Sequence, residues 1–600
     1  MLDHLPYRQI RVIDFEFRPK SVARSGFEFI KNSGERPAPV CLVSKELRTG
    51  EVTRLNYDQL KPGEPPFSMD DDVLVVGYFI CADLGCFRAL NWPMPRRILD
   101  LYAEFRMSQN FLDPKGSKPR KTGLINALTA HGLDAMGAGE KTDMRNLVLR
   151  GGPWTGEETA AYLDYCQIDV EKTAQLVITM APTIDLPRAL IRGRYMAAVS
   201  AMEWAGPPID MVTRNRFVEG WLEIQDQLIA EIDRDFGVFE GRTFKADRFA
   251  ALLIRLGITS WPLTETGQLS TDDDTFADMA KSHPVLGPLR DLKYALGQMR
   301  LNDLAVGHDG RNRTLLSPFW TRTSRNMPSN ANFIFGPAVW LRGLIKPPPG
   351  HAIDYVDWSG QEFGIAAVLS NDPNMLKAYL SSDPYFYFAQ LAGAIPADTP
   401  CTRESRRYYA AVREQYKGVC LGVQYGQTEY GIALKLGITI VAARALLAAH
   451  RAIFPVFWRW IDDTVGRAML TNQIHATFGW TAHLTAGSNP RALMNWPMQT
   501  NGSEMMRLAA CMATEAGIEV VAPVHDAFLI MAPVDRIEHD VTRMRGFMSE
   551  ASAIVLNGFR LRAGNKTIRY PDRYADDRGA KMWSTVMRCL DASQKGAANG

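Results

Sequence analysis

The stretch DYVDWSGQEFGIAA (354–367) indicates how the centre of the chain folds. It continues the strand-like sequence HAIDYVDW (351–358), so Asp357 lies at the end of a strand and Glu362 follows five residues later. Asp354 stands three residues before Asp357, and side chains three apart on a strand face opposite sides. We therefore expect Asp357 to be the functional carboxylate of this segment and Asp354 to be structural.

A second segment, RRYYAAVREQYKGVCLGVQYG (406–426), lies in a region that is expected to be helical from about 372 to 470. Such a helix would stack residues four apart along one stripe. A stripe usually faces a core, but two buried cations are costly without an anionic partner. Residues 403–417 contain five cations and two anions, with tyrosines interleaved, which favours an anionic ligand. The residues of the stripe are Arg413, Lys417, Leu421 and Tyr425.

The third segment, VVAPVHDAFLIM (520–531), is predicted to be a β-hairpin with His525 and Asp526 at its tip. A His-Asp pair in a turn does not by itself indicate a function. The pair becomes informative because it follows the acidic strand and the cationic helix in the sequence.

In this order the three segments resemble motifs A, B and C of the family A DNA polymerases, whose usual forms are DYSQIELR, RxxxKxxx(F/Y)xxxYG and VHDE. The resemblance implies that Asp357 and Asp526 bind metal ions, and that Glu362 closes off the space beside the sugar 2′ position. Several positions depart from the family pattern, among them Gly360, Gln361, Phe363 and Gly364 in the first segment. Leu421 stands where phenylalanine or tyrosine is usual, and Ala527 replaces a glutamate.

The resemblance also assigns residues to the substrates. Arg413 and Lys417 would bind phosphates, and Tyr425 would lie near the template base. The full set of implied nucleotide-binding residues is Arg413, Lys417, Leu421, Tyr425, Glu362 and His525. Shorter matches resemble the TGR segment before motif A and the helix that reads the minor groove; they imply the DNA-binding residues Arg325, Asn332, Arg491, Asn495 and Gln499.

Two acidic residues lie two apart on the strand-like segment IRVIDFEF (10–17) near the N-terminus. Asp14 and Glu16 therefore point to one face of the strand. Carboxylates at the rim of a sheet can bind divalent cations, although a solvated strand face is the commoner explanation of such a pair alone. Tyr165 and Asp169 lie four apart on a predicted helix, so they also share a face.

Together the patterns DxE and YxxxD resemble the 3′–5′ proofreading exonucleases of the DEDD superfamily, in its tyrosine branch. The resemblance implies that four carboxylates hold two divalent ions and that Tyr165 orients the attacking water. Asp83, after the second predicted strand (72–80), is chosen as the remaining carboxylate, and Asp100 is its rival. The implied metal ligands of this site are Asp14, Glu16, Asp83 and Asp169.

The composition is that of an ordinary soluble globular protein of 600 residues, with 46% hydrophobic and 22% charged residues. A formal net charge of +2 means that any surface for nucleic acid must be a local patch. The eight cysteines form no CxxC pair, which argues against a disulfide framework or a structural zinc site. The N-terminal MLDHLPYRQIRV lacks the apolar run of a signal peptide, and no apolar stretch reaches the ~18 residues of a membrane span. We expect a cytoplasmic protein without a membrane partner, in the cytoplasm of a bacterial host if a phage encodes it.

The expected fold class is an α/β ribonuclease H-like exonuclease domain followed by an α+β right-hand polymerase with palm, fingers and thumb. The exonuclease domain is expected at residues 1–188 and a helical thumb at 189–316. Residues 317–371 would form the first part of the palm with motif A, and 372–470 the fingers with motif B. Residues 471–600 would form the second part of the palm with motif C and the C-terminal tail.

The resemblance implies a template-directed DNA polymerase that adds deoxynucleotides to a primer 3′ end, with 3′–5′ proofreading and a role in phage DNA replication. It implies two Mg²⁺ ions at the polymerase site and two divalent ions at the exonuclease site. Expected partners are primer-template DNA and deoxynucleoside triphosphates, with the protein acting as a monomer; the sequence indicates no particular processivity partner. Two alternatives stay open: a nuclease whose C-terminal part only binds duplex, and a non-catalytic replication scaffold.

Overall fold

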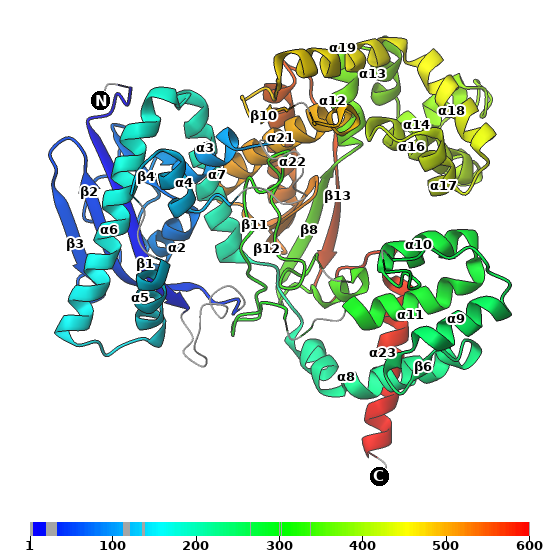
Figure 1. Cartoon of the computed structure of the whole chain (residues 1–600), viewed down its shortest axis with the longest axis horizontal. Coiled ribbons are helices and arrows are strands. Elements are labelled where there is room, and N and C mark those ends of the chain that lie inside the picture. Colours follow the sequence, from blue (N-terminus) through cyan, green and yellow to red (C-terminus); the bar gives the residue numbers. More distant parts are fainter. Residues whose placement is uncertain are drawn as a thin grey trace.

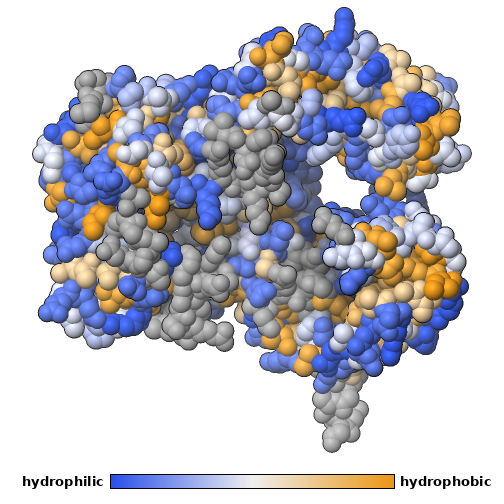
Figure 2. Space-filling view, viewed as in Figure 1, coloured by the Kyte–Doolittle hydropathy of each residue, from blue (hydrophilic) through white to orange (hydrophobic). Residues whose placement is uncertain are grey.

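The computed structural model describes residues 4–19, 33–111, 121–134, 138–264, 266–298, 301, 303–336, 338–485 and 487–598. A central sheet has an N-terminal sheet with its own helices on one side (Figure 1). On the other side lie two groups of helices, one above the other in this view. Figure 2 shows an open gap between these two groups.

The N-terminal sheet has five strands in the order β3-β2-β1-β4-β5. Strand β1 pairs antiparallel with β2 and parallel with β4, so the sheet is mixed. All of β4 is buried, as expected for a strand that is covered on both faces. The strands are β1 (Gln9–Pro19), β2 (Pro37–Glu46), β3 (Val52–Asn56), β4 (Val73–Gly77) and β5 (Arg97–Asp100). The helices of this region are α2 (Cys81–Ala89), α3 (Leu101–Ser108), α4 (Leu124–Ala130), α5 (Ala138–Arg150) and α6 (Gly156–Met180), followed by the 3₁₀ helix η1 (Ala181–Thr183).

Helix α6 begins at a capping box. The Thr155 hydroxyl accepts the N–H of Glu158 at 3.2 Å, and the Glu158 carboxylate accepts the N–H of Thr155 at 2.9 Å. From this start the helix packs against β1 and β2. Its residues Tyr165 and Asp169 are thereby brought to the acidic pair on β1.

The central sheet has the order β11-β12-β8-β13, and every neighbouring pair is antiparallel. The predicted hairpin is confirmed as β11 (Glu519–Val524) and β12 (Ala527–Pro533). The predicted strand before it is β8 (His351–Trp358), and β13 (Ala563–Arg569) forms the edge beyond β8.

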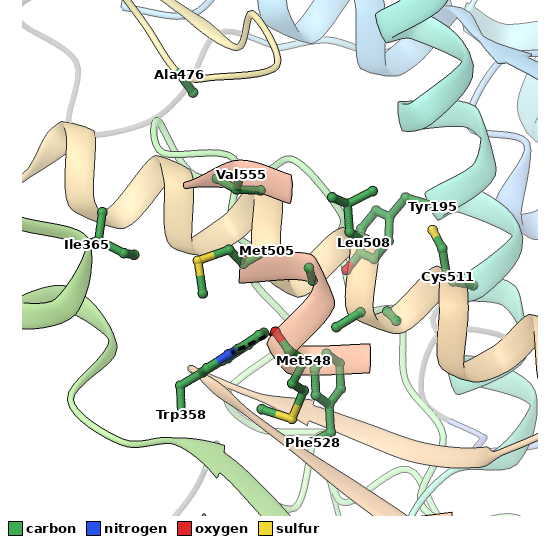
Figure 3. Close-up of a cluster of buried hydrophobic side chains, with 14 of the residues drawn as sticks. Tyr195, Trp358, Ile365, Ala476, Met505, Leu508, Cys511, Phe528, Met548 and Val555 are labelled. Carbon is green, nitrogen blue, oxygen red and sulfur yellow. Dashed lines mark hydrogen bonds between the residues drawn. The ribbon is translucent and has the colours of Figure 1, made fainter. Parts of the chain in front are cut away.

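One face of the central sheet packs against α21 (Trp496–Glu515) and α22 (Ile537–Val555). Figure 3 shows Trp358 and Phe528 of the sheet beside Met505 and Met548 of these helices. All four side chains are buried. Trp358 Nε1 donates a hydrogen bond to the carbonyl of Met548 at 3.2 Å, so the indole is satisfied in the core. This packing fixes the end of β8, where Asp357 lies.

The upper group of helices in Figure 1 has an aromatic core. Phe388, His450 and Phe454 pack on one another, and Trp458 Nε1 donates to His450 Nδ1 at 3.1 Å. Burial lowers the pKa of His450 to about 3, so its ring is neutral and can accept this bond. The elements of this group are α12 (Gln361–Ser370), α13 (Pro373–Leu380), α14 (Pro384–Leu391), α15 (Arg403–Tyr408), α16 (Ala410–Gln424), α17 (Glu429–Leu436), α18 (Ile440–Ile453) and α19 (Pro455–Thr471). The chain then passes through β9 (Gln473–His475), β10 (Thr481–His483) and α20 (Pro490–Met494) to α21.

The lower group also has an aromatic core, in which Phe244, Phe249, Trp261 and Phe276 make edge-to-face or tilted contacts. Its elements are α8 (Met211–Ile232), η2 (Asp233–Asp235), β6 (Phe239–Glu240), β7 (Thr243–Phe244), α9 (Ala246–Arg255), α10 (Asp273–Ser282), η3 (Pro284–Leu286) and α11 (Gly287–Gln298). The last helix, α23 (Ala580–Ala598), packs against α8 and the 3₁₀ helix η4 (Val339–Leu344). Residues 580–598 thus pack with the lower helices, within the predicted segment 471–600 that contains the second part of the palm and the C-terminal tail. The domain boundaries stay predictions.

Helix α7 (Leu186–Ala205) connects the N-terminal sheet to the central sheet, since it packs against β5 on one side and α21 and β11 on the other. Arg192 forms a buried two-bond ion pair with Glu104 of α3, at 2.5 and 2.7 Å. Arg194 pairs with Glu515 of α21 at 2.5 Å. At Gly193 a Cβ would lie 1.9 Å from the carbonyl of Ile98, so only glycine allows this close approach to β5.

Within the described ranges, no single helix has both the length and the apolar character needed to cross a membrane. Helices α17 and α18 meet that test of length and composition only as a pair, and they are bent by 114° where they join.

Candidate functional site

Asp357 and Asp526 lie side by side at one end of the central sheet. Asp357 is near the end of β8 and pairs in register with Ala527, directly after Asp526 in the β11–β12 turn. The N–H of Trp358 donates to the carbonyl of Asp526 at 3.3 Å. Burial raises the pKa of both carboxyls, to about 6 for Asp526, where the charge of Asp357 adds to the effect. A nearby positive charge would stabilise the ionised form of both carboxylates, and carboxylate oxygens are the ligands that a hard divalent cation prefers.

These carboxylates line a cavity of about 1150 Å³. All four residues of the predicted stripe on α16 face the same cavity, so that prediction of a shared face is confirmed. His525 and Glu362 line it as well. Its seven cationic residues outnumber its four carboxylates, which makes the cavity a site for an anionic ligand. The cations are Arg325, Arg406, Arg413, Lys417, Arg545, Arg560 and Arg562, and the carboxylates are Asp357, Glu362, Asp383 and Asp526.

Glu362 is the centre of a hydrogen-bond chain across this cavity. Its Oε1 accepts from Arg325 Nη2 at 3.2 Å and from the hydroxyl of Tyr425 at 3.3 Å. Gln499 Nε2 in turn donates to the Tyr425 hydroxyl at 3.0 Å. These hydrogen bonds link four parts of the protein: the segment before β8, helix α12, the end of α16, and α21. The Glu362 side chain is therefore held by Arg325 on one side and by Tyr425 on the other.

The two cations of the stripe are held by acidic residues. Arg413 Nε donates to Asp383 at 2.5 Å, and its Nη1 donates to Glu414 at 2.5 Å. Lys417 lies 3.7 Å from Glu414. The other oxygen of Asp383 caps α14 by accepting the N–H groups of Tyr385 and Phe386, so one buried carboxylate serves both the helix and the arginine. Sequence reasoning missed Asp383, which carries only an N-cap pattern.

Of the predicted DNA-binding residues, Arg325 has the clearest position. It lines the large cavity and also a second cavity of about 260 Å³, which His525 shares. Asn332 is 5% exposed and lines neither cavity; its carbonyl accepts the N–H of Ala305 and the side-chain amide of Asn312. A direct contact of Asn332 with DNA therefore stays a prediction.

The predicted repeat of Arg491, Asn495 and Gln499 does not lie on one helix. Arg491 is exposed on α20, Asn495 is the capping residue between two helices, and Gln499 lies on α21. The break arises because Pro497 cannot donate the backbone bond that would continue α20. Asn495 is 6% exposed, and both polar atoms of its side chain lack a hydrogen-bond partner within the described part of the chain. Such a buried amide gains free energy from any ligand that supplies its missing bonds.

Sequence reasoning missed three arginines of the cavity, Arg545, Arg560 and Arg562, and it counted Arg406 only as one of the five cations of residues 403–417. Two of the three did carry a signal. Arg560 and Arg562 alternate with Leu561 just before β13, as do residues that share one side of an extended segment.

A second acidic group lies on the N-terminal sheet. Asp14 and Glu16 of β1 and Asp169 of α6 each offer a carboxylate oxygen, and these oxygens lie within 4.8 Å of one another. The structure thus brings three of the predicted ligands together. Burial raises the pKa of Asp14 well above its usual range, and the charges of Asp83, Asp169 and Glu16 raise it further. A divalent cation would relieve this repulsion.

Tyr165 lies beside this group on α6. It is 7% exposed, and its pKa is raised by burial first and then by the charges of Asp169 and Glu16. Its hydroxyl is therefore a proton donor at ordinary pH. The thiol of Cys166, which the sequence did not single out, contacts the side chain of Asp14 at 3.4 Å.

Asp83 and its rival Asp100 have different surroundings. Asp83 accepts the N–H of Phe15 at 2.9 Å, and burial raises its pKa to about 8. It therefore lies next to β1, but it is not one of the three residues within 4.8 Å of one another. Asp100 caps α3 by accepting the N–H of Ala103 at 2.7 Å, and its other carboxylate oxygen accepts the N–H of Ile80 at 2.7 Å. Both oxygens of Asp100 therefore already have a backbone hydrogen-bond donor. The arrangement favours Asp83 over Asp100, and a metal-binding role for Asp83 stays a prediction.

Comparisons with known proteins agree on one family. A family model described as "DNA polymerase family A" matches residues 246–564. The DNA polymerase of Mycobacterium phage D29 is 23% identical over 423 residues, which cover 68% of this chain and 68% of that protein. The DNA polymerase of Escherichia phage T5 is 23% identical over 321 residues, which cover 46% of this chain and 38% of that protein. The acidic group on β1 and α6 lies outside the matched range.

The fold has a counterpart among solved structures. The structure described as the POL domain of Pol1 from M. smegmatis in complex with DNA primer-template and dNTP aligns with a TM-score of 0.68. It covers 97% of both chains at 17% sequence identity. At this identity the likeness establishes the arrangement of the chain, including the N-terminal sheet, and not the chemistry.

Proposed function

The chain belongs to DNA polymerase family A, and on that premise we propose that it is a template-directed DNA polymerase that extends a primer 3′ end with deoxynucleotides. One observation carries the proposal. Asp357 and Asp526 lie together at the floor of a cavity whose wall carries Arg413 and Lys417 on α16. Phosphoryl transfer requires this juxtaposition of metal-binding carboxylates and phosphate-binding cations.

The reaction would join the primer 3′ oxygen to the α-phosphorus of a deoxynucleoside triphosphate. The bond between the α-phosphorus and its bridging oxygen breaks, its electron pair leaves with pyrophosphate, and the hydroxyl proton passes to solvent. Asp357 and Asp526 fit Mg²⁺ by their oxygen donors and their mutual repulsion, and the ions when bound would polarise the reacting phosphoryl group. Arg413 and Lys417 would orient the phosphates and offset their developing charge.

Other residues of the cavity would select the substrate. Glu362 is held by Arg325 and Tyr425, so it can present a fixed surface to the sugar 2′ position. Asn495, with its unpartnered buried amide, and Arg325, shared by both cavities, would contact the primer-template duplex. Phosphate contacts of this kind weaken as the salt concentration rises.

We propose a second activity for the N-terminal region, a 3′–5′ exonuclease on a ribonuclease H-like fold. Asp14, Glu16 and Asp169 would hold divalent ions, with Asp83 adjoining, and Tyr165 would orient the water that attacks the terminal phosphodiester. Support comes from the gathering of these acids on β1 and α6. The likeness to the polymerases of phages D29 and T5 supports a role in phage DNA replication. We also propose that the protein acts as a monomer.

Primer extension on a labelled primer-template, with and without nucleotides, tests both activities. Wild-type protein should extend the primer with nucleotides and shorten it without them. Asp526→Asn should lose extension, while Asp535→Asn, an exposed carboxylate at the other end of the same hairpin, should behave as wild type. Folded protein that only shortens DNA would support the nuclease alternative, and protein that does neither would support the scaffold alternative.

A further inference from the structure

Three arginines on the central sheet side of the large cavity have no role in the proposed mechanism. Arg545 projects from α22, and Arg560 and Arg562 lie in the segment that leads into β13. They face the same cavity as α16 but come from a different part of the chain. We refer to Arg545, Arg560 and Arg562 as the β13 arginine cluster.

Two members of the cluster are held in place by backbone groups. Arg545 Nε donates to the carbonyl of Ala563 at 3.0 Å. Arg562 donates to the carbonyl of Tyr379, and its guanidinium lies over the Tyr379 ring at 5.1 Å. The carbonyl of Arg562 also accepts the N–H of Ser359 at 2.8 Å, just after the catalytic strand. The cluster is therefore fixed relative to Asp357.

The charge of these two arginines is not offset. Within the described residues, neither Arg545 nor Arg562 has a carboxylate within ion-pair distance, whereas Arg560 pairs with Glu550 at 2.7 Å. The fingers cations differ, because Arg413 pairs with Asp383 and Glu414. A carbonyl accepts a hydrogen bond but leaves the full positive charge available to an anion. Arg545 and Arg562 therefore keep their positive charge available to an anion in the cavity.

The order of the strands places this charge relative to the reacting atoms. Ala527 pairs with Asp357 on one side of β8, and Gly564 pairs with Asp357 on the other. Asp526, Asp357 and Arg562 therefore follow one another across the end of the sheet, which Figure 1 allows the reader to trace from β12 through β8 to β13. At Gly564 a Cβ would lie 3.4 Å from Asp357 Oδ1, so the start of β13 comes within contact distance of this carboxylate.

The second cavity adjoins the Asp526 end of this row, because His525 lines it and none of the three cluster arginines does. Its lining includes His525, next to Asp526, together with Arg325 and Asn330. If the primer end enters from that side, in-line displacement requires the leaving group to depart toward β13. The chemical group that arrives there is pyrophosphate, a compact polyanion.

We infer that the β13 arginine cluster is a binding site for the pyrophosphate leaving group, with Arg545 and Arg562 as its main ligands and Arg560 at its rim. The inference rests on the proposed polymerase function and deepens it. The site holds pyrophosphate after the bond to the α-phosphorus has broken. It therefore governs product release and the reverse reaction, in which a pyrophosphate oxygen attacks the terminal phosphodiester and a nucleoside triphosphate is released.

The test compares wild type with Arg545→Gln/Arg562→Gln. The first measurement is the pyrophosphate concentration that halves primer extension, and the second is the KM for the nucleotide. The double variant should need about tenfold more pyrophosphate, or 1.4 kcal/mol of binding, with KM changed less than about threefold. Arg569→Gln is the matched control, since Arg569 is an exposed arginine of β13 outside the cavity. Arg562→Lys, which keeps the charge, should recover part of the affinity, and thermal unfolding should show that each variant is folded.

Three results would overturn the inference. An unchanged response to pyrophosphate would show that the cluster does not bind it. An equal rise in KM would assign the cluster to the triphosphate of the entering nucleotide. A defect that grows with the length of the single-stranded template would assign it to the template backbone.

A direct titration separates this inference from the proposed function. Calorimetry with Mg²⁺ and inorganic pyrophosphate reports binding to the whole chain even if no primer is extended. Weaker binding by the double variant than by wild type and Arg569→Gln supports the site on its own. Absence of extension by folded wild type would count against the polymerase proposal alone, and equal binding by all forms would count against the site alone.

Discussion

The two acidic sites of the molecule differ in the positive charge around them. At the N-terminal sheet three carboxylates crowd within 4.8 Å, and Arg145 of α5 is a cation whose charge interacts with Glu16 and Tyr165. At the central sheet two aspartates share a cavity with seven arginines and lysines. The second site is built for a ligand that carries far more negative charge than the first.

This difference matches the groups that the two proposed reactions move. A terminal phosphodiester carries about one negative charge, and a nucleoside triphosphate carries about four. Divalent ions held by three acids can offset the first alone, whereas the second needs additional fixed cations. The count of cations around an acidic pair is therefore informative about the substrate, beyond what the acids themselves indicate.

The largest effects are expected when one of the two acidic sites is inactivated at a time, which tests whether the sites act separately. Asp357→Asn or Asp526→Asn should lower the extension rate by about a thousandfold or more, because each removes a metal ligand, and should leave shortening of single-stranded ends intact. Asp14→Asn with Glu16→Asn should do the reverse. Single-turnover rates on one labelled primer check both, and loss of both activities in a folded variant of either kind would contradict separate sites.

Changing the shape of the central site at constant cation number should have the next largest effect. Glu362→Ala removes the side chain that Arg325 and Tyr425 hold in place, so ribonucleotides should gain access. The ratio of kcat/KM for deoxy- over ribonucleotides should fall by about a hundredfold. Glu362→Gln keeps the volume and should retain most of the discrimination. An unchanged ratio in the alanine variant, with extension intact, would show that Glu362 is not the residue that excludes the 2′-hydroxyl.

A finer test concerns Leu421, which lies on the cationic stripe but offers no donor. Leu421→Tyr would add a hydroxyl near the phosphates, which can replace the contact that a dideoxynucleotide lacks. One such bond to a charged group is worth about 1.5–3 kcal/mol, so dideoxynucleotide use should rise roughly ten- to a hundredfold. Leu421→Phe is the control without a donor. Competition in single-nucleotide extension measures the ratio, and no difference between the two variants would mean that Leu421 only fills space.

The smallest expected effect is on stability, and it concerns Glu203 of α7, the helix that contacts both halves of the molecule. Its partly buried carboxylate accepts the N–H of Leu316 at 2.7 Å, and loss of water raises its pKa to about 8. Between its ordinary pKa of about 4.5 and about 8, the folded chain keeps a proton that the unfolded chain has lost, so stability falls as pH rises. Glu203→Gln should remove this slope and be more stable than wild type by about 1–2 kcal/mol at pH 8.5. Urea unfolding at pH 5 and pH 8.5 checks it, and parallel curves for the two proteins would contradict the assignment.

Local patterns predicted the strand that carries Asp357, the hairpin that carries Asp526 and the cationic helix well. The sequence around Asp357, the hairpin at Asp526 and the four-residue repeat on α16 each carry a period that fixes which side chains share a face. The resemblance to family A, drawn from these segments, agrees with the family match.

Contacts between distant segments could not be predicted in the same way. Asp383 binds Arg413 across 30 residues, and Arg562 meets Tyr379 across 183. No local period encodes such pairs, because they depend on how the helices pack. The break at Pro497 shows the opposite error, because a four-residue repeat predicts one helix there although the proline interrupts it.

Helix α7 has a consequence for how a strand end would pass between the two sites. Gly193 lies against β5, Arg192 is bonded to α3 and Arg194 to α21, so this one helix contacts elements of both halves of the molecule. Under the two proposed activities, a primer end that moves from the central site to the N-terminal acids would have to separate from its template. Mispaired ends open more readily than paired ones, because fewer base contacts must be broken. In that proposal, the melting of the duplex end would decide between extension and shortening of the primer.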